Sequence, residues 1–449
     1  MEKPNILLMI SHDTGRYLGC YGKTVETPNL DELAKKGVRF DQYFCPAPQC
    51  SPSRGSIITG LYPHNHGMIG LAHLGFSMNP DVATLPKELH KHGYETALIG
   101  FSHETIDEPD SRLTSSTYKL GYEHVLPVPG DRGPDVAKRV VQYLEEKAAC
   151  QDMQPFFASV GFFETHRDFD EYEAIADPVE EVVPPPYLPD TPQVREDFAL
   201  LHGSVKVLDQ SIGQILRGLK DTGLSKNTLV IYTTDHGIAF PRAKGTLMDA
   251  GLETALVMYY PDRIEGGKVV DQLLCNVDLM PTLLEFAGAD APQGTDGSSF
   301  LSILEQDARN VPTRDHFFSE LTWHDLYHPM RSIRTEKYKY IRNFEDGPSV
   351  YLPLDIHRSL SGIVVREQYY VPNVPEELYD LEKDPLETSN LVGLPEYEVV
   401  LEELRLKVSD WMKVTKDPLL QDEVAGIAAP EWKEQVENGS AYAYKKRSN

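Results

Sequence analysis

Short, continuous apolar runs recur along the first part of the chain, at residues 5–10, 95–100, 155–162 and 228–234. Runs of this length are typical of strands that are buried on both faces of a parallel sheet. Longer segments with helical spacing of apolar residues lie between them, at residues 85–92, 134–150 and 194–219. This alternation predicts an α/β fold with a large mixed, mostly parallel sheet and helices on both of its faces.

The pattern changes in the last third of the chain. Residues 330–344 alternate between apolar and polar positions, as a half-buried strand does, and residues 395–414 show helical spacing. We therefore expect a second, smaller α+β domain in which an antiparallel sheet packs against a helix. The predicted division is a larger domain at residues 1–310 and the smaller C-terminal domain at residues 311–449.

Polar side chains follow the four predicted buried strands at the point where each one ends. In chain order they are His12, Asp13, His103, His166, Asp235 and His236. In open α/β sheets ligands bind beyond the carboxyl ends of the strands, so these residues are site candidates. An aspartate in such a place is more often a turn former, and a histidine is about as often a structural hydrogen-bond donor. Both interpretations stay open at this point.

The composition limits the classes of partner. The 449 residues carry a formal charge of −26 at pH 7, which argues against nucleic acid and against an anionic membrane surface. No apolar run approaches the roughly 20 residues that cross a bilayer. The first apolar run begins at Asn5 and leaves no room for a secretory leader. The five cysteines show no paired spacing and do not indicate a disulfide framework. We expect a cytoplasmic protein.

The stretch Cys50-Ser51-Pro52-Ser53-Arg54 combines a thiol with a predicted helix start. Pro52 suits the first turn of a helix, and the backbone N–H groups at such an end attract an anion. Arg54 adds a fork of donors that matches the oxygens of an oxyanion. A buried free cysteine beside a proline turn is the plain alternative. We interpret the stretch as a site for a tetrahedral oxyanion.

This Cys-x-Pro-x-Arg pattern, followed by a short helix and Thr59-Gly60, resembles the signature of the type I, formylglycine-dependent sulfatases of the alkaline phosphatase superfamily. Asp235-His236-Gly237, Lys244-Gly245 and residues 377–385 are similar to further segments of that family. The resemblance implies an alkaline-phosphatase-like fold and a hydrolase that cleaves a sulfate ester or an N-sulfamate. It also implies that a maturation enzyme oxidises Cys50 to formylglycine, whose hydrate is the nucleophile.

The resemblance also assigns roles to the candidate side chains. The implied catalytic residues are Cys50, Arg54, His103, His166 and Lys244. One divalent metal ion is implied, with the ligands His12, Asp13, residue 50, Asp235 and His236. The family has an acid where His12 stands and a lysine where Phe101 stands. Calcium is the implied metal. Because an imidazole replaces a carboxylate, Mn²⁺, Mg²⁺ and Zn²⁺ are less excluded than usual.

Residues 163–167 and 320–331 are similar to the N-sulfoglucosamine sulfohydrolase-like (heparan sulfamidase-like) members of the family. A small sulfated carbohydrate is then the implied substrate, as in glycosaminoglycan degradation. The residues expected to lie near it are Glu164, Arg167, His324, His328 and Arg331. Two alternatives stay open. Asp-His-Gly and the absent lysine favour a phosphonate or phosphate monoester hydrolase on the same fold. The departures at His12 and Phe101 also fit a noncatalytic carbohydrate-binding descendant.

Overall fold

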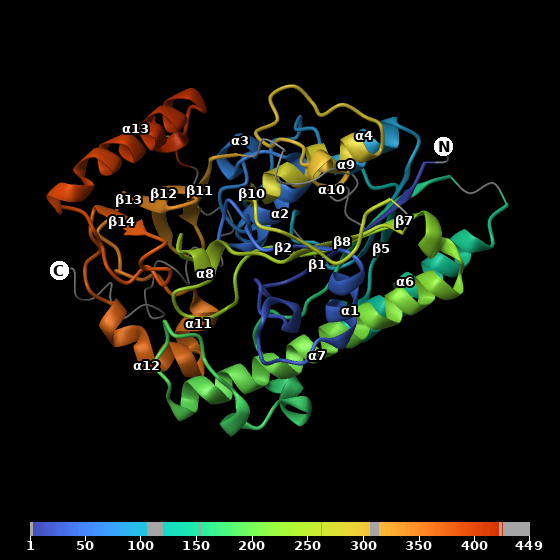
Figure 1. The fold of residues 1–449 in the computed structure, drawn as a ribbon, viewed down its shortest axis with the longest axis horizontal. Coiled ribbons are helices and arrows are strands. Elements are labelled where there is room, and N and C mark those ends of the chain that lie inside the picture. Colours follow the sequence, from blue (N-terminus) through green and yellow to red (C-terminus); the bar gives the residue numbers. More distant parts are fainter. Residues whose placement is uncertain are drawn as a thin grey trace.

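The structure is a computed structural model of the chain, and it describes residues 3–105, 120–151, 154–261, 263–305, 314–421 and 424. Across these residues the chain forms one large sheet, a smaller C-terminal sheet and a two-stranded pair, with helices around them (Figure 1). The two-stranded pair consists of β3 (Tyr43–Phe44) and β10 (Leu274–Cys275).

The large sheet has eight strands within the described residues, in the order β5-β4-β6-β1-β7-β8-β2-β9. Its strands are β1 (Asn5–Ser11), β2 (Val38–Phe40), β4 (Glu95–Gly100), β5 (His124–Leu126), β6 (Phe156–Gly161), β7 (Thr228–Thr234), β8 (Leu256–Tyr259) and β9 (Lys268–Val270). Neighbouring strands pair in parallel except that β8 runs antiparallel to β7 and to β2. The predicted mixed, mostly parallel sheet is confirmed, and the four predicted buried strands are its central neighbours β4, β6, β1 and β7.

Helices cover both faces of this sheet (Figure 1). On one face lie α1 (Pro28–Lys36), α6 (Gly133–Ala148) and α7 (Pro192–Asp221). On the other lie α2 (Cys50–Thr59), α4 (Leu85–Lys91), α9 (Leu279–Phe286) and α10 (Leu301–Glu305). The long α7 starts where expected, because the Thr191 side chain accepts the Val194 N–H and Pro192 occupies the first turn. Its buried side chains recur at intervals of three and four residues, so one stripe of the helix faces the sheet.

The C-terminal sheet is antiparallel, in the order β11-β12-β13-β14. Its strands are β11 (His316–Trp323), β12 (Tyr327–Thr335), β13 (Tyr338–Asn343) and β14 (Glu376–Asp380), and α13 (Glu398–Val414) packs on it. The predicted smaller α+β unit is confirmed as an architecture. The predicted boundary at residue 310 falls outside the described residues, so the division into domains stays a prediction. The remaining α-helices of the described residues are α3 (Pro63–His66), α8 (Asp249–Leu252), α11 (Leu354–Arg358) and α12 (Leu360–Tyr369), and short 3-10 helices occur between the longer elements.

One apolar cluster joins the C-terminal sheet to the first part of the chain. Phe44 and Val277 of the first part pack with Phe317, Ile333 and Trp411 of the second. The ring centroids of Phe44 and Phe317 are 5.3 Å apart and the rings are stacked. This packing holds the C-terminal sheet against the first part of the chain. In the described part of the chain, no helix combines the length and the apolar character needed to span a bilayer.

Candidate active site

The four central strands end at one edge of the large sheet, and polar residues follow each of them. Because β4, β6, β1 and β7 are parallel neighbours, their carboxyl ends lie side by side. The residues placed there are His103 after β4, His166 after β6, His12 and Asp13 after β1, and Asp235 and His236 after β7. The amino end of α2 meets the same edge, since the Ser53 hydroxyl donates to the Asp235 carbonyl. Segments far apart in the sequence thus converge at one place.

Asp13 lies at the centre of a buried cluster of carboxylates and imidazoles. Its Oδ1 is 2.8 Å from His12 Nδ1 and 2.9 Å from His236 Nε2, and its backbone N–H donates to Asp235 Oδ1 over 2.9 Å. Burial alone would raise the pKa of Asp13, but Lys244 and the two imidazoles outweigh it and hold the pKa well below its usual value. Burial also opposes ionisation of Asp235, but His236, His12 and Arg54 outweigh it and lower the pKa of Asp235 to about 2. Both carboxylates are therefore ionised at neutral pH, as the ligands of a cation must be.

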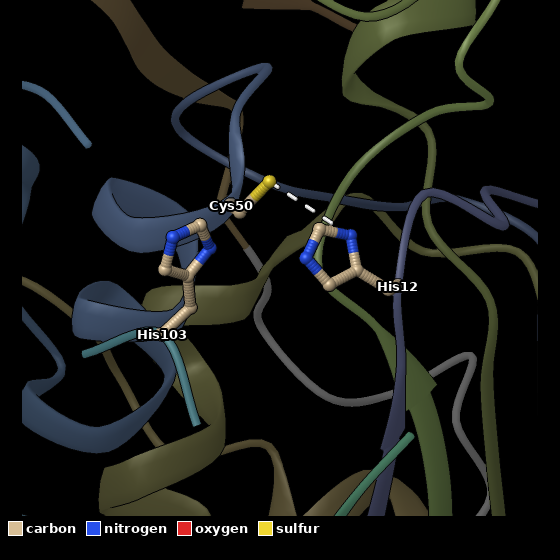
Figure 2. A group of neighbouring side chains, drawn as sticks. All are labelled: His12, Cys50 and His103. Atoms are coloured by element: carbon tan, nitrogen blue, oxygen red, sulfur yellow. Dashed lines mark hydrogen bonds between the residues drawn. The ribbon is translucent and has the colours of Figure 1, made fainter. Parts of the chain in front are cut away.

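Cys50 is the first residue of α2 and lies against this cluster with 2% of its surface exposed. Its Sγ is 3.4 Å from His236 Nε2, 3.7 Å from Asp13 Oδ1 and 3.8 Å from His12 Nδ1. Figure 2 shows the sulfur close to the rings of His12 and His103, with a dashed line to His12. Burial and the nearby Asp13 carboxylate raise the pKa of the Cys50 thiol well above its usual value. The unmodified side chain is therefore a neutral thiol and a weak nucleophile.

The donor atoms around Asp13 fit a divalent cation. One ligand atom from each of His12, Asp13, Cys50 and Asp235 lies within 4.8 Å of the other three. His236 Nδ1 donates to the carbonyl of the next residue over 2.9 Å, which turns its Nε2 lone pair toward Asp13. Imidazoles that bind metals are oriented by a second hydrogen bond of this kind. Two carboxylates and two imidazoles together form a mixed oxygen and nitrogen donor set.

Arg54 lies behind these carboxylates and is 1% exposed. Its Nε donates to Asp235 Oδ2 over 3.0 Å, and a terminal nitrogen donates to the Ser11 carbonyl over 3.2 Å. Phe101, which stands where the family pattern has a lysine, covers the guanidinium, with 5.1 Å between the Arg54 Cζ and the ring centroid. Arg54 therefore holds Asp235 in place, and its contact with sulfate oxygens stays a prediction.

Lys244 enters the cluster from the loop after β7. Its Nζ is 2.7 Å from Asp13 Oδ2, 3.0 Å from Asp355 Oδ2 and 3.5 Å from His166 Nε2. Burial would lower the pKa of this lysine, but the two carboxylates outweigh it and raise the pKa well above its usual value. His166 Nδ1 donates to the carbonyl of the next residue, so its Nε2 lone pair faces the ammonium. Burial and Lys244 lower the pKa of His166. A charged lysine thus stands beside a neutral imidazole.

His103 lies on another side of His12, with 5.9 Å between the two ring centroids. Its Nε2 is 3.2 Å from Nδ1 of His73, and these two rings are stacked. Burial lowers the pKa of both, to about 4 for His73. The sequence did not point to His73 or to Asp355, because neither follows a predicted strand nor belongs to a recognised motif. Their place in the site depends on tertiary packing.

Three residues that were expected near the substrate are held in internal contacts instead. Glu164 is 0% exposed and accepts a backbone N–H over 2.8 Å and a tyrosine hydroxyl over 3.1 Å. Arg167 forms two hydrogen bonds with Asp197, at 2.7 and 2.8 Å, and Arg331 forms two with Asp417. The carboxylate partners of the two arginines lie 30 and 86 residues away in the sequence, so a local sequence pattern could not predict them. We leave these three residues out of the proposed substrate contacts.

The two predicted histidines of the C-terminal sheet differ in their surroundings. His328 is 3% exposed, packs 5.5 Å from the Tyr351 ring between centroids, and has a pKa lowered to about 4 by burial. Its contacts are those of a packed core residue. His324 is 5% exposed, and neither of its ring nitrogens has a hydrogen-bond partner among the described residues. His324 therefore stays a candidate for substrate contact.

Comparison with known proteins agrees with this geometry. Residues 4–289 match the Sulfatase family, and residues 241–358 match the family described as N-sulphoglucosamine sulphohydrolase, C-terminal. An Ulvan-active sulfatase of Formosa agariphila is 31% identical, over 95% of this chain and 83% of that protein. The N-sulphoglucosamine sulphohydrolase of Homo sapiens is 29% identical, over 92% and 91%. A solved structure of a protein in complex with its substrate D-glucosamine-2-N,6-O-disulfate has a TM-score of 0.70 at 20% identity, covering 93% of this chain and 99% of that chain.

The large mixed sheet, the smaller antiparallel sheet and the likeness to solved structures define a fold of the alkaline-phosphatase-like class, with a buried cluster of polar residues at its strand ends. Within that class the chain belongs to the sulfatase family and is a sulfuric ester hydrolase. The resemblance that rested on Cys-x-Pro-x-Arg is thereby confirmed.

Proposed function

We propose that the chain hydrolyses a sulfate ester or N-sulfamate of a sugar, with residue 50 as the position of the nucleophile. The observation that carries this proposal is the convergence of Asp13, Cys50, Asp235 and Lys244 in one buried cluster. Sugar sulfates are supported by the similarity to sulfatases named for ulvan and for N-sulphoglucosamine. The substrate is thus a small sulfated carbohydrate.

We propose that Cys50 is converted to formylglycine, as membership of the sulfatase family implies, and the chemistry of its surroundings supports this. A buried neutral thiol cannot supply a good oxygen or sulfur nucleophile, whereas the hydrate of an aldehyde carries hydroxyl groups at the same position. We infer that a formylglycine-generating or equivalent maturation enzyme acts on this chain. Asp13 and His236, at 3.7 and 3.4 Å from the Cys50 sulfur, are placed to orient a hydroxyl there.

A divalent metal ion is proposed at the same cluster, held by His12, Asp13, Asp235, His236 and residue 50. When bound, such an ion supplies positive charge for a sulfate oxygen and lowers the pKa of a hydroxyl beside it. Calcium prefers oxygen ligands, whereas Mn²⁺ and Zn²⁺ accept imidazole readily. The two imidazoles of the cluster favour Mn²⁺ or Zn²⁺ over calcium for this chain.

Lys244 and His166 are proposed to serve the sulfate and the leaving group. The ammonium is aimed at the centre of the cluster and can bind a sulfate oxygen, in the manner of a fixed electrostatic clamp. His166 Nε2 lies 3.5 Å from Lys244 Nζ, so the pair can hold and pass one proton between them. That proton is available for the oxygen or nitrogen that leaves. His103, hydrogen-bonded to His73, is proposed to take a proton near residue 50.

The experiment compares three substrates with the full chain co-expressed with a maturation enzyme. These are N-sulfoglucosamine, 4-nitrophenyl sulfate and 4-nitrophenyl phenylphosphonate. We expect sulfate release from the first two and an aldehyde at residue 50 in the peptide mass. Cys50→Ala should lose on the order of a thousandfold or more in kcat/KM, whereas Cys275→Ala, at an equally buried cysteine outside the cluster, should keep its activity. An intact Cys50 thiol in fully active protein would refute the proposal.

One rival has a specific observation in its favour. Asp235-His236-Gly237 and the replacement of a lysine by Phe101 reduce the positive charge of the site and add an imidazole to the ligands. Both departures suit a phosphonate or phosphate monoester hydrolase. Faster turnover of the phosphonate than of either sulfate would favour that rival. Complete inactivity of a chain with an aldehyde at residue 50 would instead favour a noncatalytic carbohydrate-binding protein.

A further inference from the structure

Helix α11 brings a carboxylate of the C-terminal part to the edge of the site. Ile356 of this helix packs in one apolar cluster with Ala239, which belongs to the same loop as Lys244. The Asp325 carboxylate accepts the backbone N–H of the first residue of α11 over 2.6 Å. Packing on one side and this hydrogen bond on the other fix the start of the helix. The second residue of α11, Asp355, is thereby held beside the catalytic cluster.

Asp355 makes two hydrogen bonds inside the protein. Its Oδ2 is 3.0 Å from Lys244 Nζ, and its Oδ1 accepts the Ile356 backbone N–H over 2.9 Å. One ligand atom from each of Asp13, His166 and Asp355 lies within 4.8 Å of the other two. A carboxylate offers about four lone-pair positions, so roughly half of its accepting capacity is still available.

The exposure of these side chains shows which of them a substrate meets first. The side chains of Asp355 and His166 are 21% and 26% exposed, whereas those of Lys244 and Asp13 are 2% and 0% exposed. Asp355 and His166 therefore form the outer edge of the cluster. If sulfate lies inward, the group that carries it must lie against this edge. His324 precedes Asp325, whose carboxylate holds the start of α11, and the His324 Nδ1 lies 3.4 Å from Asp325 Oδ1.

A fixed carboxylate at this edge selects what can lie there. It repels sulfate oxygens and accepts hydrogen bonds from hydroxyl and amine groups. We propose that Asp355 is a substrate-binding residue that accepts a hydrogen bond from a hydroxyl or amino group of the sugar carrying the scissile sulfate. This inference rests on the proposed function. It divides the site into an inner part that binds sulfate and an outer part that recognises a sugar donor group.

The test uses the matured full chain with Asp355→Asn, which keeps the shape of the side chain and removes its charge. Asp177→Asn is the matched control, because Asp177 is 20% exposed and also contacts a lysine and a histidine. These two partners belong to α7 and not to the catalytic cluster. The substrates are N-sulfoglucosamine, glucosamine 6-sulfate and 4-nitrophenyl sulfate, of which the last has no hydroxyl or amine donor. Initial rates give kcat and KM for each combination of protein variant and substrate.

We expect Asp355→Asn to lower kcat/KM for both sugar sulfates by about tenfold to a hundredfold, mainly through KM, as loss of a hydrogen bond to a charged group does. Turnover of 4-nitrophenyl sulfate, which shares the Lys244 contact but offers no donor group, should fall by a clearly smaller factor, and Asp177→Asn should resemble the wild type throughout. An equal loss with all three substrates, or no loss with any, would overturn the inference.

A second measurement separates this inference from the proposed function. Calorimetry with the Cys50→Ala chain measures binding of the same sugar sulfates without turnover. Weaker binding on adding Asp355→Asn supports the substrate contact even if the wild type hydrolyses none of the sulfates, a result that would refute the sulfatase proposal alone. Unchanged binding would refute the contact at Asp355.

Discussion

At the scale of single residues, His12 is the side chain that most distinguishes this site from the family pattern. It stands where the family has an acid, and its Nδ1 lies 2.8 Å from Asp13 Oδ1 in the proposed metal group. His236 adds a second imidazole at the carboxyl end of the neighbouring strand β7, 2.9 Å from the same oxygen. Exchanging an oxygen ligand for nitrogen weakens the match to hard ions such as calcium. The ion preference of the site should therefore depend on His12.

The substitution His12→Asp tests this dependence. We expect the wild type to bind Mn²⁺ or Zn²⁺ more tightly than Ca²⁺, and the variant to shift the ratio of the two affinities toward Ca²⁺ by about tenfold or more. Calorimetric titration of the metal-free chain measures both affinities directly and needs no turnover.

His73→Asp serves as the control for this titration. It adds the same charge near the site, but His73 belongs to no group of metal-ligand candidates in the described structure. Its affinity ratio should stay that of the wild type. If His73→Asp and His12→Asp shift the ratio equally, charge and not ligation sets the preference.

The sequence predicted the positions of some site residues but not of others, and the difference depends on whether a local pattern marks the residue. Asp13, Asp235 and His236 could be placed near one another, because a buried parallel strand fixes where its carboxyl end lies. Arg167 and Arg331 pair with distant carboxylates in the structure, and polarity along the chain does not say whether an arginine turns toward a ligand or toward such a partner. Asp355 neither follows a predicted strand nor belongs to a recognised motif, so no local pattern marked it. Its position results from long-range packing, which only the folded chain defines.

At the scale of elements, the approach of α11 to Lys244 depends on Gly245. This residue has φ of +82°, and a Cβ added to it would lie 2.9 Å from Pro353 Cγ, just before α11. A side chain here would strain the backbone and push the start of α11 away from the cluster. The boundaries of the long elements were predicted well from apolar spacing, but such a contact between a loop and a short helix was not.

Gly245→Ala should lower the free energy of unfolding by roughly 3 kcal/mol, from left-handed backbone strain and steric overlap together. Gly223→Ala is the matched control, since Gly223 has φ of +79° and no atom within 4 Å of an added Cβ. It should cost only about 1 kcal/mol. Urea denaturation of the two variants measures the difference. Equal losses would mean that Pro353 moves aside at little energetic cost, and that the position of α11 does not depend on a glycine at residue 245.

At the scale of the whole molecule, a buried ionic cluster joins the C-terminal sheet to the rest of the chain. Lys339 of β13 lies 2.5 Å from Asp249 of α8 and 2.7 Å from Glu387, which follows β14. The Glu387 carboxylate also accepts the Asp249 backbone N–H over 2.6 Å. Burial raises the pKa of Glu387 to about 7, although Lys339 and this hydrogen bond oppose the rise. The contact between the two parts should therefore respond to pH near neutrality.

The sign of this response follows from the two pKa values of Glu387. The folded value of about 7 lies above the unfolded value of 4.5, so the folded chain binds the proton more tightly. The stability that this proton gives is complete below pH 4.5 and is lost as the pH rises through 7. Glu387→Gln resembles the protonated form at every pH. The free energy of unfolding of the variant minus that of the wild type should therefore rise by about 2 kcal/mol between about pH 5 and pH 8. Urea denaturation at both pH values measures this difference, and other titrating groups cancel in it. A difference that stays constant between the two pH values would show that Glu387 has the same pKa in the folded and the unfolded chain. The contact between the C-terminal sheet and the rest of the chain would then not depend on protonation of Glu387.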